Sequence, residues 1–331
     1  MISASVIIHL PYTPDLTEGG ISYACRSLAC ASDRLGTSPL DRLRRIVAGA
    51  AVELAFRRYL SEQKIPFTVL GAEPFTHPGH YDVALGGHRC EVKSYLISRR
   101  HQITQLRQDP GLVLQAPALV PLDEFAAEGH KPDDLYVFAF LLGLTANAQA
   151  DVERALTAGQ PAYLIHPLPD GWARPASWLP FEKLVLKSEC DTPINVELGG
   201  QDAERKFITT VLELPPRMPF PVGQTFYSLA YVHAGHRPVA RIGLHSPRHG
   251  EAYVIQTFDW GNLWVYGMDI LLAGWLTHEE FRCNASVLNP GMATFQYART
   301  RVKNLSVPIT NLAPLVPLFE KIKAWTAERL V

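Results

Sequence analysis

Two consecutive glycines, Gly86 and Gly87, separate two short runs that have the alternating pattern of β-strands. Such a pair predicts a tight hairpin, because both central residues of the favoured turn adopt a positive φ. A turn centred on the glycines places Asp82 directly opposite Glu91. Lys93 lies two residues beyond Glu91 and therefore shares its face of the sheet. The sequence thus predicts two acids and an amine on one small patch.

Two carboxylates that face each other across a strand pair repel and destabilise the sheet. They become favourable when a divalent cation lies between them, and hard oxygen ligands with room for water and phosphate suit Mg²⁺. We therefore expect Asp82, Glu91 and the backbone carbonyl of Val92 to bind Mg²⁺, for which Mn²⁺ can substitute. With Lys93 orienting the attacking water and stabilising the transition state, this set is suited to phosphodiester hydrolysis.

A helix is predicted upstream, over residues 39–63. Ser38 is a suitable cap and Pro39 occupies the first helical position. Glu53 shares a helix face with apolar residues, so we expect its carboxylate to point toward the sheet and to join the site. The alternative is a surface ion pair with Arg57, four residues further along the helix.

The chain resembles the PD-(D/E)XK, or restriction-endonuclease-like, nuclease superfamily over residues 38–168. The resemblance is carried by Gly49-Ala50-Ala51-Val52-Glu53, by Asp82 and by Glu91-Val92-Lys93. It implies an α/β fold with an αβββαβ core and a mixed sheet. It also implies that Asp82 and Glu91 are metal ligands, that Lys93 is the catalytic lysine and that Glu53 is the acid of the first helix. Tyr81 stands where the family often has a proline.

Basic residues follow the candidate catalytic strand. Arg99, Arg100 and Gln102 leave this strand directly, so we expect them to contact the phosphates of DNA. The arginines of the first helix are explained equally well as a solvated helix face. The formal net charge of −1 excludes a strongly basic coat but allows a local basic patch.

The length and the distribution of prolines predict three parts. Residues 1–37 form an N-terminal arm, residues 38–168 the nuclease domain, and residues 169–331 a β-rich recognition or interaction domain that ends in a helix. Leu318 and Ile322 have the spacing of one helix face. We expect this helix to pack on its own domain, with partner binding as the alternative.

Composition narrows the classes of protein. Hydrophobic residues make up 47% of the chain and charged residues 19%, which is typical of a globular protein. No apolar run reaches the ~18–20 residues of a membrane span. The five cysteines are scattered and do not form a disulfide framework, which favours a cytoplasmic location. Cys25 and Cys30 have a spacing within reach of zinc, but no second pair lies nearby.

The sequence therefore predicts a Mg²⁺-dependent endonuclease that acts on DNA. Restriction or defence against foreign DNA is the setting that the resemblance implies. The expected partners are DNA and either a second copy of the chain or another component of a defence system. Two alternatives remain open: a non-catalytic nucleic-acid-binding or assembly subunit that retains the nuclease fold, and a nuclease directed at RNA.

Overall fold

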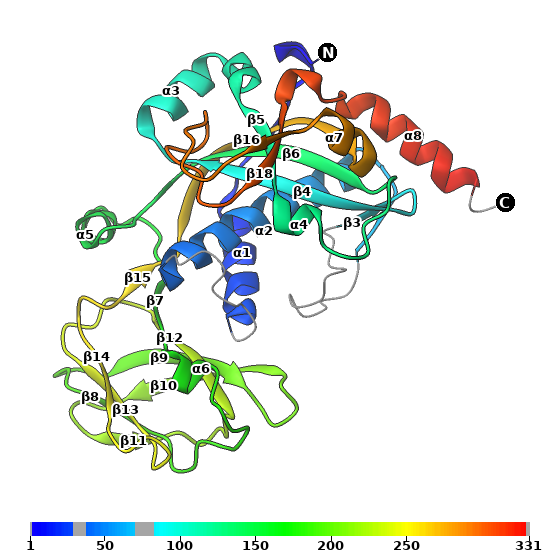
Figure 1. Cartoon of the computed structure of the whole chain (residues 1–331). Coiled ribbons are helices and arrows are strands. Elements are labelled where there is room, and N and C mark those ends of the chain that lie inside the picture. Colours follow the sequence, from blue (N-terminus) through cyan, green and yellow to red (C-terminus); the bar gives the residue numbers. More distant parts are fainter. Residues whose placement is uncertain (1, 29–37, 70–82, 329–331) are drawn as a thin grey trace.

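A computed structural model describes residues 2–28, 38–69 and 83–328 of the chain. Its centre is a six-stranded sheet (Figure 1). Strands β4 and β6 run parallel, and all other neighbours in this sheet run antiparallel. The predicted α/β class with a mixed sheet is confirmed. The order across the sheet is β1 (Ile8–Pro11), β16 (Val265–Thr277), β6 (Leu135–Thr145), β4 (His88–Ile97), β3 (Val83–Leu85) and β2 (Phe67–Thr68).

The glycine hairpin forms as predicted. Gly86 and Gly87 have φ values of 55° and 84°, the positive values that a turn of this kind requires. Leu85 lies opposite His88 and Val83 lies opposite Cys90, which is the expected register. Asp82 lies outside the described residues.

Helices cover one face of the central sheet. α2 (Pro39–Glu62) begins as predicted, because the Ser38 hydroxyl accepts a hydrogen bond of 3.1 Å from the backbone N–H of Asp41. α1 (Pro14–Ser27) and α8 (Leu315–Glu328) join α2 in one apolar core against this face. Leu318 and Ile322 of α8 are fully buried there, so the last helix is packed, but on the central sheet and not on the β-rich part 169–331 to which the sequence assigned it.

The opposite face carries a second apolar core, built mainly from aromatic residues of β6 and from the elements that cover them. A three-stranded sheet lies over this face with several short helices. These elements are β5 (Pro117–Pro121), β17 (Ser286–Leu288), β18 (Asn304–Pro308), α3 (Arg100–Gln108), α4 (Leu122–Phe125), α7 (His278–Asn284), η1 (Ala4–Val6), η2 (Pro110–Gln115) and η3 (Ile309–Asn311). The central sheet is therefore buried on both sides, which explains why the pattern of β6 is almost continuously apolar.

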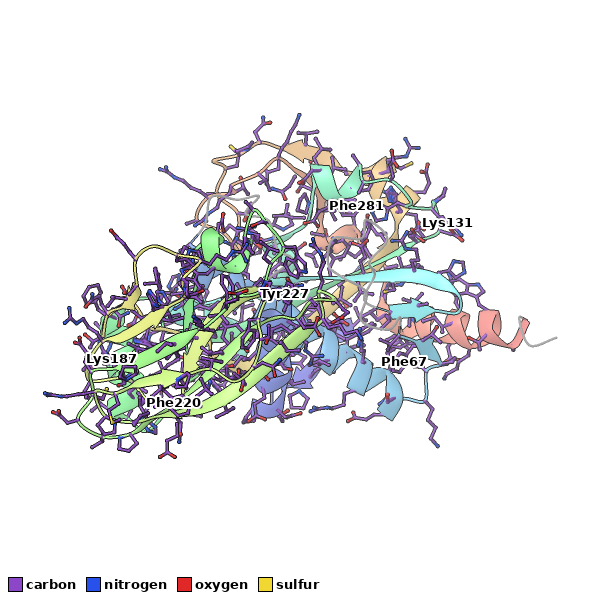
Figure 2. All side chains as sticks on the ribbon, turned by 90° about the horizontal axis from the view of Figure 1, so that it is seen from below. Phe67, Lys131, Lys187, Phe220, Tyr227 and Phe281 are labelled. Atoms are coloured by element: carbon purple, nitrogen blue, oxygen red, sulfur yellow. The ribbon has the colours of Figure 1, made fainter. Side chains whose placement is uncertain are left out.

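Two further sheets form a β-rich unit with a core of its own (Figure 1). Figure 2 shows Lys187 of this unit at one side of the molecule and Lys131 at the other. The five-stranded sheet contains β10 (Phe207–Leu214), β9 (Ile194–Gln201), β12 (Ser228–Ala234), β7 (Leu164–Pro167) and β15 (Gly261–Asn262). The four-stranded sheet contains β11 (Pro219–Pro221), β8 (Val185–Ser188), β13 (Ile242–His245) and β14 (Tyr253–Ile255). α5 (Gln149–Thr157) and α6 (Asp170–Ala173) accompany them.

Strand pairing divides the chain differently from the predicted parts 1–37, 38–168 and 169–331. β1 and β16 lie outside residues 38–168, yet both belong to the central sheet. β16 pairs along β6 from Val265 to Thr277, so the chain returns to the central sheet after the β-rich unit. The β-rich unit is thus an internal segment, and α8 packs on the central sheet. None of the helices in the described ranges combines the length and the apolarity needed to cross a membrane.

Candidate functional site

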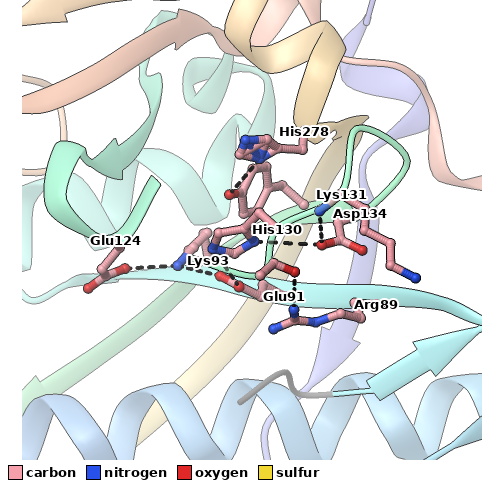
Figure 3. Close-up of polar contacts among 10 residues, drawn as sticks. Arg89, Glu91, Lys93, Glu124, His130, Lys131, Asp134 and His278 are labelled. Carbon is pink, nitrogen blue, oxygen red and sulfur yellow. Dashed lines mark hydrogen bonds and ion pairs between the residues drawn. The ribbon is translucent and has the colours of Figure 1, made fainter. Parts of the chain in front are cut away.

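Strand β4 holds Glu91 and Lys93 on the face of the sheet that looks away from α2 (Figure 3). Alternate side chains of the strand, such as Cys90, contribute to the core shared with α2, whereas Tyr95 contributes to the opposite core. The Nζ atom of Lys93 lies 2.7 Å from Oε2 of Glu91 and 2.9 Å from Oε2 of Glu124 on α4. The prediction that Glu91 and Lys93 share a face is confirmed.

The ammonium group of Lys93 is a fixed positive charge. Its side chain is only 17% exposed, and burial alone would lower its pKa. The carboxylates of Glu91 and Glu124 outweigh burial and raise the pKa of Lys93 above its usual range. Lys93 therefore stays protonated at neutral pH. It can donate hydrogen bonds to an anionic oxygen and cannot act as a base.

Histidines and a further acid extend this cluster. Nε2 of His130 lies 3.8 Å from Oε1 of Glu91, and Nδ1 of His130 lies 3.7 Å from Oδ2 of Asp134. The ring of His278 stacks on that of His130, with 5.1 Å between centroids. Burial, and then the neighbouring His130, lower the pKa of His278, so its imidazole is neutral at pH 7.

The sequence reasoning missed Glu124, His130, Asp134 and His278. Glu124, His130 and Asp134 precede β6, which lies beside β4 in parallel register, with Tyr136 opposite Glu91. One signal could have found these three residues. They lie in a polar run just before β6, a buried strand that is the parallel neighbour of β4. His278 begins α7, far along the chain, and no spacing links it to the other three.

The predicted metal ligands are described only in part. Glu91 and Glu124 offer carboxylate oxygens near the same ammonium, and such oxygens suit Mg²⁺. Val92 lies opposite Val137 in the ladder, with its side chain against the core shared with α2. Asp82 lies outside the described residues. Among the residues that the structure describes, no group of three or more His, Cys, Asp or Glu side chains could hold a metal.

Glu53 does not join this cluster. It lies on α2, which packs against the other face of the sheet, and its carboxylate forms an ion pair with Arg57. The ion pair that the sequence offered as the alternative is the arrangement found. The reason is the alternation of β4, which turns Glu91 and Lys93 away from the layer that contains α2.

The three predicted nucleic-acid contacts separate. Arg99, at the start of α3, lines a cavity on the α2 side of the sheet, whereas Arg100 lines a second cavity beside Arg107. Gln102 is only 9% exposed, and its Nε2 atom donates a hydrogen bond of 2.9 Å to the carbonyl of Phe295. The predicted DNA contact for Gln102 is therefore corrected, because its amide is buried and used within the chain.

Comparison of the chain with protein-family models, with curated proteins and with solved structures finds no match.

Proposed function

We propose that this chain is a Mg²⁺-dependent nuclease that hydrolyses phosphodiester bonds in DNA. The observation that carries the proposal is the Glu91–Lys93 pair, whose charged groups lie 2.7 Å apart on one face of β4. A carboxylate can ligate a metal ion, and a permanently protonated ammonium can donate hydrogen bonds to a phosphate. Together these two groups can stabilise the negative charge that develops on the phosphate in the transition state.

The order of the core elements supports the proposal. α2 is followed by β2, β3, β4 and α3 and then, after η2, β5 and α4, by β6, and β4 and β6 run parallel. This is the order that the resemblance to the PD-(D/E)XK superfamily implies. We further propose that the core is restriction-endonuclease-like and that the setting is restriction or defence against foreign DNA.

Each residue has a role in this proposal. Glu91 and Asp82, with the carbonyl of Val92, would hold Mg²⁺, which when bound supplies positive charge and lowers the pKa of water. Lys93 has three N–H donors, and its contacts with Glu91 and Glu124 use two of them. The third donor is the one we assign to a phosphate oxygen of the substrate.

A second candidate is a nucleic-acid-binding or assembly subunit that retains the fold without catalysis. Two observations favour it: carboxylates on two sides neutralise the charge of Lys93, and Glu53 lies across the sheet from Glu91. Such a subunit would bind DNA and leave it intact.

Incubation of the full chain with linear duplex, circular duplex, single-stranded DNA and RNA separates these candidates. We expect DNA to be cut with Mg²⁺ or Mn²⁺, and EDTA to stop the reaction. Lys93→Ala should abolish cleavage, while Lys187→Ala, which removes an exposed strand lysine of the β-rich unit, should leave it unchanged.

Because Lys93 is largely covered and bonded to two carboxylates, thermal unfolding of each variant must accompany the assay, with Lys93→Arg as a variant that keeps the charge. A folded Lys93→Ala variant that still cuts DNA at the wild-type rate would refute its assigned role. If only RNA is cut, the chain is a nuclease whose substrate is RNA and not DNA. If DNA is bound but not cut, the chain is a non-catalytic nucleic-acid-binding subunit.

A further inference from the structure

A cavity of about 430 Å³ lies at the ends of β4 and β6 beside the N-terminal half of α2. Its walls combine α2, the end of β4 and the segment of residues 289–303 that connects β17 to β18. The cationic side chains that line it are Arg44, Arg45, Arg99, Arg299 and Arg301. Arg44 is neutralised by Asp41 at 3.0 Å, the only carboxylate among the described lining residues. The other four arginines have no such partner in the part of the chain that the structure describes, and we call the cavity that they line the arginine pocket.

The arginine pocket carries an excess of positive charge over its described lining residues, among which Asp41 is the one carboxylate. Within the described ranges, none of Arg45, Arg99, Arg299 and Arg301 forms an ion pair with a carboxylate. Arg45, Arg299 and Arg301 are exposed and Arg99 is partly buried. Partial burial in the cavity, and then the nearby charge of Arg301, lower the pKa of Arg45. Arginines elsewhere are commonly paired with an acid, as are Arg58, Arg107, Arg154, Arg174, Arg217, Arg237, Arg241 and Arg282. Like charges gathered in one cavity indicate that an anion belongs there.

The segment that presents Arg299 and Arg301 is anchored from two sides. Gln102 of α3 donates to the carbonyl of Phe295, and Gln296 donates to the carbonyl of Pro117 at 2.7 Å. Within the segment, the hydroxyl of Thr300 donates to the carbonyl of Asn289 at 2.9 Å. The three polar side chains that make these bonds are all buried. The backbone that carries the exposed residues Arg299 and Arg301 is therefore fixed before any ligand arrives, which reduces the entropy lost on binding.

The lining chemistry points to a phosphate with a polar body attached. Guanidinium groups match phosphate oxygens in pairs, and Ser94, Ser98, Thr145 and Asn147 add neutral hydrogen-bonding groups. The volume is in the range of small-ligand sites. Gln296 also lines the cavity, and its buried Oε1 atom accepts no hydrogen bond within the described structure. A ligand that carries both phosphate and a donor group, as a nucleotide does, suits this set.

The arginine pocket also adjoins the candidate catalytic cluster. Ser94 and Tyr297 line both the arginine pocket and a smaller cavity of about 190 Å³ that reaches Lys93 and Glu124. The two cavities thus meet at β4, although Glu91 and Lys93 point to the face opposite α2.

We propose that the arginine pocket binds the phosphate monoester of a nucleotide, either free or at the phosphorylated end of a nucleic-acid strand. This site goes beyond the proposed nuclease activity and does not require it, because binding can be measured without cleavage.

The test uses the full chain in EDTA, so that no metal-dependent cleavage occurs, and a short fluorescent oligonucleotide with either a 5′-phosphate or a 5′-hydroxyl. We expect the phosphorylated strand to bind at least about tenfold more tightly, since each lost arginine–phosphate contact has a cost of this order. Arg45→Gln with Arg301→Gln should remove that preference. Arg154→Gln with Arg241→Gln, which removes the same charge from paired surface arginines, should keep it.

Competition by a nucleoside monophosphate and by inorganic phosphate then identifies the source of the phosphate. Displacement by the nucleotide at concentrations where inorganic phosphate has no effect supports a free nucleotide, and displacement only by phosphorylated strands supports a strand end. Equal binding of the two oligonucleotides, or an unchanged preference in the Arg45 and Arg301 double variant, would overturn the proposal. Failure to cleave DNA would leave it intact.

Discussion

The charged side chains on the two sides of β4 differ in whether they have partners of opposite charge. On the side of Glu91, the ammonium of Lys93 meets two carboxylates within 3 Å, and His130 and Asp134 follow in the same network. In the arginine pocket, four guanidinium groups share one cavity without a carboxylate partner among the described residues. We infer that the ion-paired groups around Lys93, on what we call the balanced side, fix the local geometry of the chain. On the unbalanced side, the guanidinium groups of the arginine pocket, unpaired within the described structure, are free to bind an anionic ligand.

Removing the charge on the balanced side should have the largest effect on stability. Lys93→Met leaves the carboxylates of Glu91 and Glu124 without the ammonium that both contact, and we expect a loss of about 3 kcal/mol in the free energy of unfolding. This is the low end of the range for a broken buried pair, because Glu124 is half exposed. Urea denaturation measures the loss. An unchanged midpoint would show that the network does not hold the fold together.

Removing an anchor of the arginine pocket should have a smaller effect. Gln102→Leu leaves the carbonyl of Phe295 without its donor, which we expect to cost about 1–2 kcal/mol. The same variant should weaken binding of a phosphorylated oligonucleotide several-fold, because Arg299 and Arg301 lose their support. If the destabilised variant binds the phosphorylated oligonucleotide with wild-type affinity, the hydrogen bond of Gln102 does not support the arginine pocket.

Neutralising the unbalanced side should leave stability almost unchanged. Arg45→Gln removes a charge without an acidic partner, so we expect the free energy of unfolding to stay within about 0.5 kcal/mol of wild type. In low salt a slight gain is expected, because repulsion from Arg301 is relieved. A loss as large as that of Lys93→Met would contradict the distinction between the two sides.

The smallest effect is a pH dependence on the balanced side. The pKa of His278 is lowered in the folded state, mainly by burial, so the unfolded chain binds the proton first as the pH falls below about 6.5. Stability should therefore decrease from that pH down to the folded pKa, and His278→Phe should show less of this decrease. The NMR titration of the His278 ring provides the direct check. A titration midpoint above 6.5 would contradict this prediction, because protonation of His278 would then stabilise the folded state.

Local features of this fold could be predicted from the sequence. Gly86-Gly87 determines the hairpin, and Ser38 with Pro39 determines the start of α2, because both signals act within a few residues. The period of two along β4 likewise predicts that Glu91 and Lys93 share a face.

Features that depend on packing between distant segments could not be predicted. The alternation of β4 does not say which face α2 covers, so Glu53 was assigned to the wrong side of the sheet. Gln102 looked exposed in a polar run, but the 289–303 segment covers it. The return of β16 to the central sheet required knowledge of a pairing across more than a hundred residues.

The most direct test of the central claim is plasmid cleavage measured across a Mg²⁺ titration for wild type and for Glu91→Gln. Glu91→Gln keeps the size of the side chain and leaves Lys93 paired with Glu124, so the fold should survive. We predict metal-dependent cleavage by the wild-type chain and none by Glu91→Gln at any Mg²⁺ concentration. Equal rates for the two proteins, or wild-type protein that binds DNA and never cuts it, would contradict the account.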